Sequence, residues 1–438
     1  MTTIKNPADF DLYGAIGTVT ELVPTTGRNS PVAPATYSVD KGKEKPTFED
    51  KIAMSYGVPI PMRDSSGEFD EIIRDADGKP KTGMAVMING EAAEAHRLSE
   101  ALFDVDGIDW GGIFVNPPDR EYIAALIGKV NGFTGPDIET QVEVAIAKIA
   151  DATASSWTAS HRHVDAVIRY AIDPETGKQL WSGGSSLKRD IILADALCDS
   201  TWLIRNAFNS ALFGFWNSNS GTGVRAKLAR GISASVTGFG SHLVATGTTK
   251  GSVIGDVYND LLIGFDKHGQ LQLLDKKPSK GDYRPSVQGL GTVPGPVGAS
   301  AISCETILRR SSLSLAGMRR IRFADDPDSA KRTAAVRALA AAGMYATSVV
   351  ATEVSFLRSG TTLRPQSTVW PAHTTAGEKS LLEVDSDSAR DVLLAAMDDL
   401  DRLGLGQAEP IQLRHSDAVL ELMIKSLAAK KSEGESDS

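Results

Sequence analysis

The feature that most constrains the fold is a long alanine-rich segment at residues 328–358. Alanine is the strongest helix former, so this composition predicts one long helix. Apolar residues at helical spacing predict further helices at 90–103, 387–403 and 415–430. Alternating apolar and polar residues predict a strand at 228–238. The chain is therefore expected to combine helices and strands.

Turn residues between alternating segments predict two β-hairpins. One covers residues 163–181 and turns at 173–177, and the other runs from Leu261 to Leu274. Residues 301–323 are predicted to be a strand that leads into an arginine-rich run. Helices are predicted to start near Ser186 and near Ser200, and the second carries an apolar stripe of Leu203, Ile204, Ala207, Phe208, Ala211 and Leu212.

Length and composition exclude several classes of protein. The 438 residues suffice for one large elaborated domain or for two to three ordinary ones. No stretch reaches about 18 uninterrupted apolar residues, so we expect no membrane span. The first residues have neither the basic nor the apolar region of a signal peptide. Cys198 and Cys304 have no pairing motif, which is typical of a protein of the reducing cytoplasm.

The charge distribution favours an anionic partner although the net charge is −9. Residues 371–438 contain 14 acidic and 7 basic residues, a difference of −7, so most of the acidity lies in this last segment. Residues 201–250 and 306–323 contain no acidic residue, and each stretch contains five arginines or lysines. Attraction to phosphate is local and is screened beyond about 8 to 10 Å, so this clustering matters more than the total.

Motifs of enzymes are not evident. The sequence has neither the G-x-S-x-G of a serine hydrolase nor a phosphate-binding P-loop. His161 and His163 could share a metal on a strand, but no third ligand is evident nearby, so we interpret them as structural. Asp104 and Asp106 begin a segment like a calcium loop that lacks its later ligands, and we interpret it as a turn. We expect neither an enzyme nor a cofactor.

Two segments suit contact with a nucleic-acid backbone. Residues 217–230 combine glycines with three cations, and the predicted long loop at 276–300 contains Lys280 and Arg284. Glycine lets the backbone approach a phosphate chain, and such contacts do not read the base sequence. Each segment alone is more typical of a flexible surface loop.

Four segments in the same order resemble one known family. They are LFGFWNS at 212–218, which is followed by glycine and by Arg225, Ala226 and Lys227; NGEAAEAHRL at 89–98; KPS at 277–279 with GLGTVP at 289–294; and LSL at 313–315 with MRRIRF at 318–323. In these segments the chain is similar to the crRNA-binding backbone subunit of type I-G (I-U) CRISPR effector complexes, a member of the RAMP superfamily.

The resemblance implies an α+β fold and an assembly. Residues 1–372 would form an RRM-like (ferredoxin-like) RAMP palm with large inserted finger and thumb segments, and residues 373–430 a helical C-terminal extension. The acidic composition of 431–438 predicts a disordered tail. The implied partners are crRNA, target DNA through the crRNA, further copies of the chain, the large Cascade subunit, a crRNA-processing or capping subunit, and a recruited helicase-nuclease.

The resemblance also selects candidate RNA-binding residues by their positions in the motifs. Charge alone adds Lys188, Arg205 and Arg284 as weaker candidates. If Arg319 and Arg320 lay on a strand, they would face opposite sides, so at most one would meet a given groove. The candidates are Arg97, Arg225, Lys227, Arg230, Lys280, Arg319, Arg320 and Arg322.

Two other functions remain open from the sequence. The chain could be a RAMP-superfamily endoribonuclease that cuts RNA with a loop aspartate, for which Asp104 or Asp106 is available. It could also be a self-assembling structural protein without nucleic acid, since its loop-rich composition and acidic charge allow this.

Overall fold

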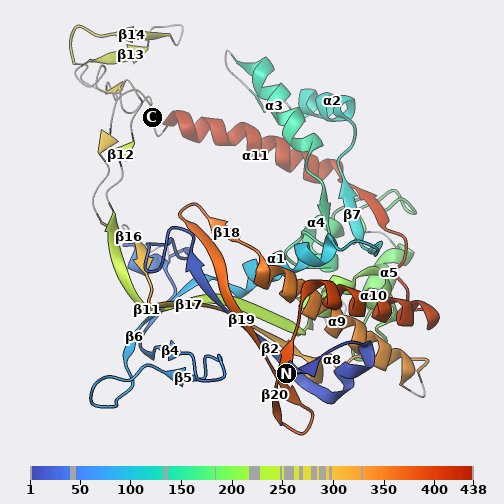
Figure 1. The fold of residues 1–438 in the computed structure, drawn as a ribbon. Helices are drawn as coiled ribbons and strands as arrows, with labels where there is room; N and C mark the ends of the chain where they lie inside the picture. Colours follow the sequence, from blue (N-terminus) through green and yellow to red (C-terminus); the bar gives the residue numbers. More distant parts are fainter. Residues whose placement is uncertain are drawn as a thin grey trace.

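One ten-stranded mixed sheet organises the fold (Figure 1). The computed structural model describes residues 2–436 apart from 40–45, 131, 134–136, 183, 217–226, 247–248, 251–260, 266–269, 278–283, 286–292, 295–297 and 327–328. The strands run in the order β1 (Thr2–Thr3), β20 (Lys379–Glu383), β19 (Thr361–Thr374), β2 (Tyr13–Pro24), β17 (Thr306–Ser314), β11 (Ile232–Thr246), β6 (Thr82–Asn89) and β3 (Met54–Pro59). β16 (Gly298–Ser303) pairs with β11, and β18 (Ser355–Arg358) pairs with β19.

Four strands form the centre of this sheet, in the order β19, β2, β17, β11. Each is antiparallel to its neighbours. Thr20 of β2 lies opposite Arg309 of β17 on one side and Thr368 of β19 on the other. Along the chain, helix α1 (Glu91–Phe103) comes between β2 and β11, and helix α9 (Ala330–Thr352) comes between β17 and β19.

Helices α1, α9 and α10 (Ser386–Arg402) pack against one face of the sheet, and share a core with strand residues such as Ile16, Leu313 and Ala372. α9 is the predicted alanine-rich helix. It is long and apolar enough to cross a membrane, but 83% of its apolar window is buried inside the protein, as in the core helix of a globular fold. Gly343 allows close packing, because a Cβ there would lie 2.4 Å from Leu313 Cδ1.

The opposite face of the sheet is only partly covered. The short strands β4 (Pro61–Met62) and β5 (Glu71–Ile72) lie over it, with a small core of Ile60, Phe239 and Leu308.

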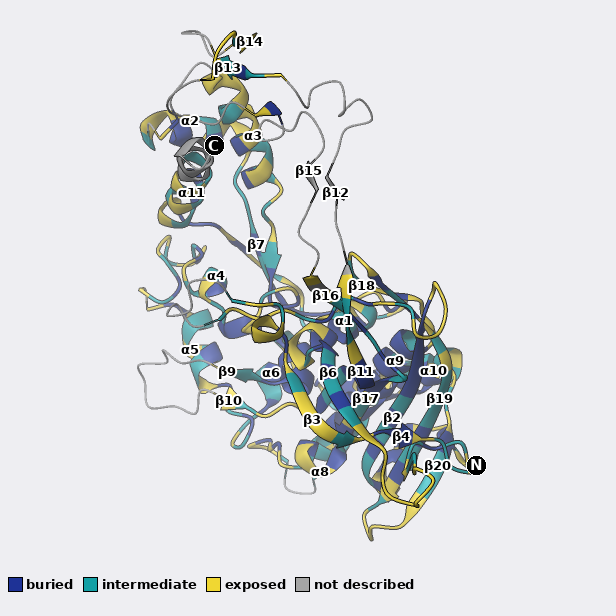
Figure 2. Ribbon diagram, turned by 90° about the vertical axis from the view of Figure 1, so that its left-hand side faces the viewer, coloured by how far each residue is buried: buried dark blue, intermediate teal, exposed yellow. Residues whose placement is uncertain are grey.

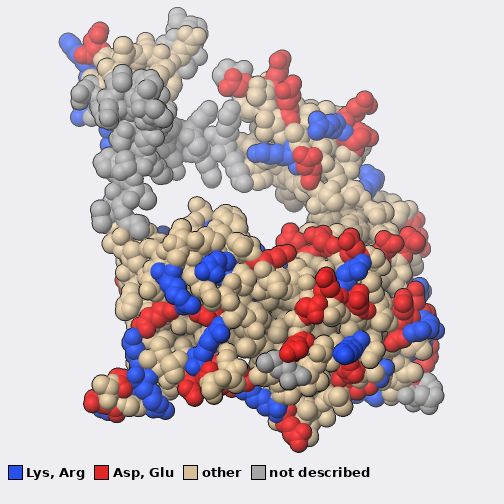
Figure 3. Space-filling view, in the orientation of Figure 1, with Lys and Arg blue, Asp and Glu red and all other residues tan. Residues whose placement is uncertain are grey.

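The view in Figure 3 shows lysine and arginine gathered over the strands on the left and acidic side chains more frequent on the right. The C-terminal acidity found in the sequence is thus partly on α10, which contains Asp387, Asp391, Asp398, Asp399 and Asp401.

Two projections leave the sheet (Figures 1 and 2). One extends from β11 and β16 through β12 (Thr249–Lys250) and β15 (Val293–Pro294) to the hairpin of β13 (Ile263–Phe265) and β14 (Leu271–Leu273). The other contains α2 (Arg120–Val130), α3 (Ile138–Ala150) and α11 (Asp417–Ser436), which have a separate core. Small sheets complete the fold: β7 (Ile113–Asn116) with β8 (Ala154–Ser155) and β21 (Ile411–Arg414), and β9 (Phe215–Trp216) with β10 (Lys227–Leu228).

Most predicted elements are present, so the chain is an α+β protein. The strands of the hairpin predicted at 261–274 are confirmed, and its turn lies outside the described residues. The helix predicted near Ser186 is α5 (Ser186–Leu193). The helix predicted from Ser200 is divided into α6 (Thr201–Asn206) and α7 (Phe208–Phe213), with the non-helical Ala207 between them. All of α7 is buried, so its stripe lies within the core and not along a surface.

The hairpin predicted at 163–181 is only partly correct. Ile172 and Gln179 form an isolated antiparallel bridge on either side of the predicted turn, but residues 163–170 form no strand. This segment forms the 3₁₀ turn Arg162–Val164 and the short helix α4 (Ala166–Arg169). Asp165 caps α4, because its carboxylate accepts a hydrogen bond of 3.0 Å from Val167 N. This local cap outweighs the alternating pattern. The predicted turn is present, and Gly177 N donates to Asp173 O.

The strand predicted at 301–323 is only partly correct. β16 ends at Ser303 and β17 ends at Ser314, whose hydroxyl caps the short helix α8 (Leu315–Met318). Arg319, Arg320 and Arg322 therefore follow a helix, and the strand-based expectation for their directions does not apply. The predicted boundary at residue 373 lies inside β19.

Candidate nucleic-acid interface

Three of the candidate cations surround one cavity. Lys227 belongs to β10, Arg230 follows it, and Arg320 follows α8, and all three line a cavity of about 790 Å³. None of the described residues that line it is acidic. Apolar side chains form most of the remaining wall: Leu197, Ala211, Phe215, Leu228, Met318 and Ile321. The tertiary structure thus brings together cations from the two acid-free stretches of the sequence.

The hairpin of β9 and β10 forms one wall of this cavity. Trp216 lies opposite Lys227, and its side chain is 62% exposed. Gly214 precedes β9 with φ +73°, and a Cβ there would lie 2.6 Å from Leu228 O. The glycine of the LFGFW segment is therefore required for the hairpin to close, and the hairpin in turn places Trp216 and Lys227 at the cavity.

Arg230 also forms an ion pair with the first turn of α1. Its Nη1 lies 2.7 Å from Glu91 Oε2, and both side chains are well exposed. An exposed pair of this kind contributes little to stability. The carboxylate does, however, compete with any anion that approaches Arg230.

The other arginines of the run after α8 are bound to the protein's own backbone. Arg319 Nη2 lies 3.3 Å from both Phe10 O and Asp11 O. Arg322 Nη1 donates to Arg319 O and Ile321 O at 2.8 Å. Among the described lining residues, Arg320 is the arginine that this run contributes to the cavity.

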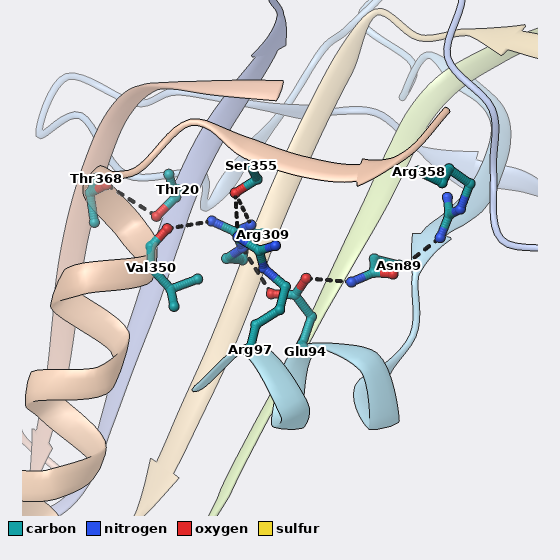
Figure 4. A network of polar contacts seen from close by, with 9 residues as sticks. All are labelled: Thr20, Asn89, Glu94, Arg97, Arg309, Val350, Ser355, Arg358 and Thr368. Carbon is teal, nitrogen blue, oxygen red and sulfur yellow. Dashed lines mark hydrogen bonds and ion pairs between the residues drawn. The ribbon is translucent and has the colours of Figure 1, made fainter. Parts of the chain in front are cut away.

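Arg97 belongs to a different group of polar residues, which joins α1 to the sheet (Figure 4). Its Nη2 donates to Ser355 Oγ at 3.1 Å, and its Nε is buried without a partner. Arg309, only 3% exposed, is 2.9 Å from Glu94 Oε2 and also binds Ser355. Asn89 donates to the other oxygen of Glu94. Arg97 is thus half-buried beside this network and does not line the cavity.

None of the remaining candidates that the structure describes lines the cavity. Arg225 and Lys280 lie outside the described residues. Lys188 Nζ donates to Trp181 O at 2.7 Å, and Arg205 Nε donates to Gly406 O at 3.3 Å. Arg284 is exposed.

Sequence reasoning missed a buried arginine behind the hairpin. Arg162 is 5% exposed and has φ +55°. Its Nε donates to Gly214 O at 3.1 Å, and its guanidinium lies over the ring of Phe213. No carboxylate among the described residues pairs with it, and burial, assisted by Arg230, lowers the pKa of Arg162 to about 10. Nothing in the sequence around His161–His163 distinguishes this arginine from an exposed one.

His163 is buried next to Arg162, among Trp202, Phe215 and Ser210. Its Nδ1 lies 2.7 Å from Ser210 Oγ. Burial, with a smaller contribution from Arg162, lowers the pKa of His163 to about 3. The imidazole is therefore neutral at physiological pH.

This lowered pKa predicts a loss of stability in mild acid. The unfolded chain takes up a proton at His163 below about pH 6.5, whereas the folded chain does so only near pH 3. Between pH 7 and pH 5 this group should reduce the free energy of unfolding by about 2 kcal/mol. Urea unfolding of wild type and His163→Asn at both pH values measures this. Equal losses in the two proteins would contradict it.

Candidates for other chemistry lie apart from the cavity. In the described part of the chain, no three histidine, cysteine, aspartate or glutamate side chains form a group that could hold a metal ion. Asp104 and Asp106 are exposed at the end of α1, and neither lines the cavity. Asp106 O accepts a hydrogen bond from Arg390.

Comparison with known protein families gives a match for the part of the chain that contains the β9–β10 hairpin. Residues 124–242 match the family described as "CRISPR-associated protein GSU0053". This chain is similar to a CRISPR-associated protein. The match covers about a quarter of the chain, and it includes Arg162, Trp216, Lys227 and Arg230, whereas Arg320 lies beyond it.

Other comparisons add little. No curated protein sequence matches the chain. Chains of solved structures do match, including one described as "CRISPR RNA-guided surveillance complex, pre-nicking". The match to that chain has 10% identity and a TM-score of 0.26, and covers 94% of this chain and all of the other. At this TM-score the similarity does not bear on the fold or the site.

Proposed function

We propose that this chain is the crRNA-binding backbone subunit of a type I-G Cascade surveillance complex. The observation that carries the proposal is the cavity lined by Lys227, Arg230 and Arg320, whose described lining contains no acidic residue and one wall of which lies in the segment that matches a CRISPR-associated family. Contacts of this kind grip an RNA strand without reading it, and base pairing by the guide then supplies the specificity. The role requires no catalytic group, and we propose that the chain is not an enzyme and acts in the cytoplasm.

The strand order supports an RRM-like palm within this proposal. An RRM-like (ferredoxin-like) fold has a β-α-β-β-α-β order, in which the two helices pack on one face of the sheet. Strands β2, β11, β17 and β19, with α1 and α9 between them, have this order along the chain. The β12–β15 projection is our candidate for an inserted thumb.

The proposal also names the partners. Further copies of the chain would line one crRNA, together with the large Cascade subunit and a crRNA-processing or capping subunit. Target DNA would bind through the crRNA, and a helicase-nuclease would be recruited afterwards.

Co-purification tests the proposed function directly. The chain is expressed with and without a crRNA from its own locus, and the RNA content of the purified particle is measured. We expect RNA of defined length in the particle. A chain that ignores crRNA at low salt, even when the partner subunits are present, would refute the proposal.

The ion pair between Glu91 and Arg230 yields a further prediction. Glu91→Gln removes the competing carboxylate 2.7 Å from Arg230 while it keeps the shape of the side chain. We expect single-stranded RNA to bind a few-fold more tightly at low salt, because about one phosphate contact is no longer opposed. Fluorescence anisotropy with labelled RNA measures the change. Glu71→Gln, on β5 and outside the lining of the cavity, is the control, and an equal gain there would show a general charge effect.

A further inference from the structure

The cavity is too large and too apolar to serve phosphate alone. Its volume of about 790 Å³ is in the range of pockets that hold small organic molecules. Phe215, Met318 and Ile321 contribute apolar walls, and a phosphate gains nothing from contact with them. Part of the ligand should therefore be apolar.

An exposed aromatic residue also lines the cavity. Trp216 lines it, yet 62% of its side chain is exposed to solvent. A planar indole in this position can stack on the face of a nucleobase, and stacking on aromatic side chains is how proteins hold unpaired RNA bases. Such stacking tolerates any sequence, because every base has a π-face.

The cations lie on two separate parts of the cavity wall. Lys227 lies on β10 and Arg230 follows it, whereas Arg320 comes from the segment after α8. A nucleotide within an RNA strand has a phosphate on each side of its base. Cations on two elements can hold both phosphates of one nucleotide. An acidic side chain of a protein partner would also match the positive charge of these cations, but it would make no use of the apolar walls.

We propose that this cavity binds one unstacked nucleotide of a single-stranded RNA, with its base against Trp216 and the apolar wall and its phosphates at Lys227, Arg230 and Arg320. The inference rests on the proposed function, that the chain binds RNA. It adds a place where the protein holds a base as well as the backbone.

Cross-linking tests the position of the base. The chain is mixed at low salt with single-stranded RNA in which 5-iodouridine replaces uridine, irradiated, and mapped by mass spectrometry. We expect cross-links at Trp216, Phe215 or Met318. RNA binding without any cross-link in these segments would overturn the pocket and leave the proposed function intact. No RNA binding at low salt would overturn both.

An affinity comparison tests the energetic role of the base. We expect RNA to bind about tenfold more tightly than an abasic oligomer of the same length and charge. Trp216→Ala should remove most of this preference and Trp216→Phe should keep it. Tyr170→Ala is the matched control, because Tyr170 is 46% exposed and does not line the cavity. An equal preference in wild type and Trp216→Ala would overturn the proposal.

Discussion

Replacing Glu94 with glutamine should lower the free energy of unfolding by about 3 to 5 kcal/mol. Glu94 is fully buried and pairs with Arg309, which is only 3% exposed. The substitution leaves a buried guanidinium without its counter-charge, which costs far more than the loss of one hydrogen bond. The pair also joins α1 to β17, and Arg309 reaches Val350 O of α9 (Figure 4). Equilibrium unfolding in urea measures the change.

A matched control lies on the same helix. Glu91→Gln breaks an exposed ion pair with Arg230, and should cost less than about 1 kcal/mol. The double variant Glu94→Gln with Arg309→Met should recover part of the loss, because it removes the unpaired charge as well. Equal losses for Glu91→Gln and Glu94→Gln would show that burial does not set the importance of these pairs.

Replacing Lys227, Arg230 and Arg320 together with alanine should weaken binding of single-stranded RNA about a hundredfold at 0.1 M salt. Each lost phosphate contact reduces the slope of log binding constant against log salt concentration by about 0.7, so the slope should decrease by about 2. The difference from wild type should nearly vanish toward 1 M salt. Anisotropy titrations over a range of salt concentrations measure both effects.

A charge-matched variant separates the cavity from general attraction. Arg364, Arg402 and Lys425 are exposed on β19, α10 and α11, and none lines the cavity. Their triple alanine variant changes the net charge by the same amount. If it weakens RNA binding as much as the cavity variant, the cavity is not the site.

The candidate site shows what the charge pattern of the sequence indicates about a binding surface and what it does not. The sequence shows that residues 201–250 and 306–323 contain no acidic residue, and Lys227, Arg230 and Arg320, which come from these two stretches, line one cavity in the structure. The same pattern did not distinguish Arg309, which is buried in an ion pair, from Arg310, which is exposed. On a strand these neighbours face opposite sides, and only packing decides which side is the core.

Long periodic segments were determined by the sequence itself. The helices at α1, α9, α10 and α11 follow from local propensity and from apolar spacing, and both act within a few turns of chain. Strand β11 and the β13–β14 hairpin follow from alternation in the same way. The alternating pattern predicted the wrong structure where a side chain could cap a helix, as Asp165 does at the start of α4.

Tertiary structure decided the features that depend on residues distant in sequence. The cavity exists because Gly214 lets the β9–β10 hairpin close and because α8 places Arg320 across from it. Arg162 and His163 are buried because α6, α7 and β9 pack over them. Propensity describes a residue's own backbone, whereas burial and charge pairing are set by which distant residues meet; the sequence alone therefore specified the helices and the cationic stretches, and the fold determined which cations face a ligand.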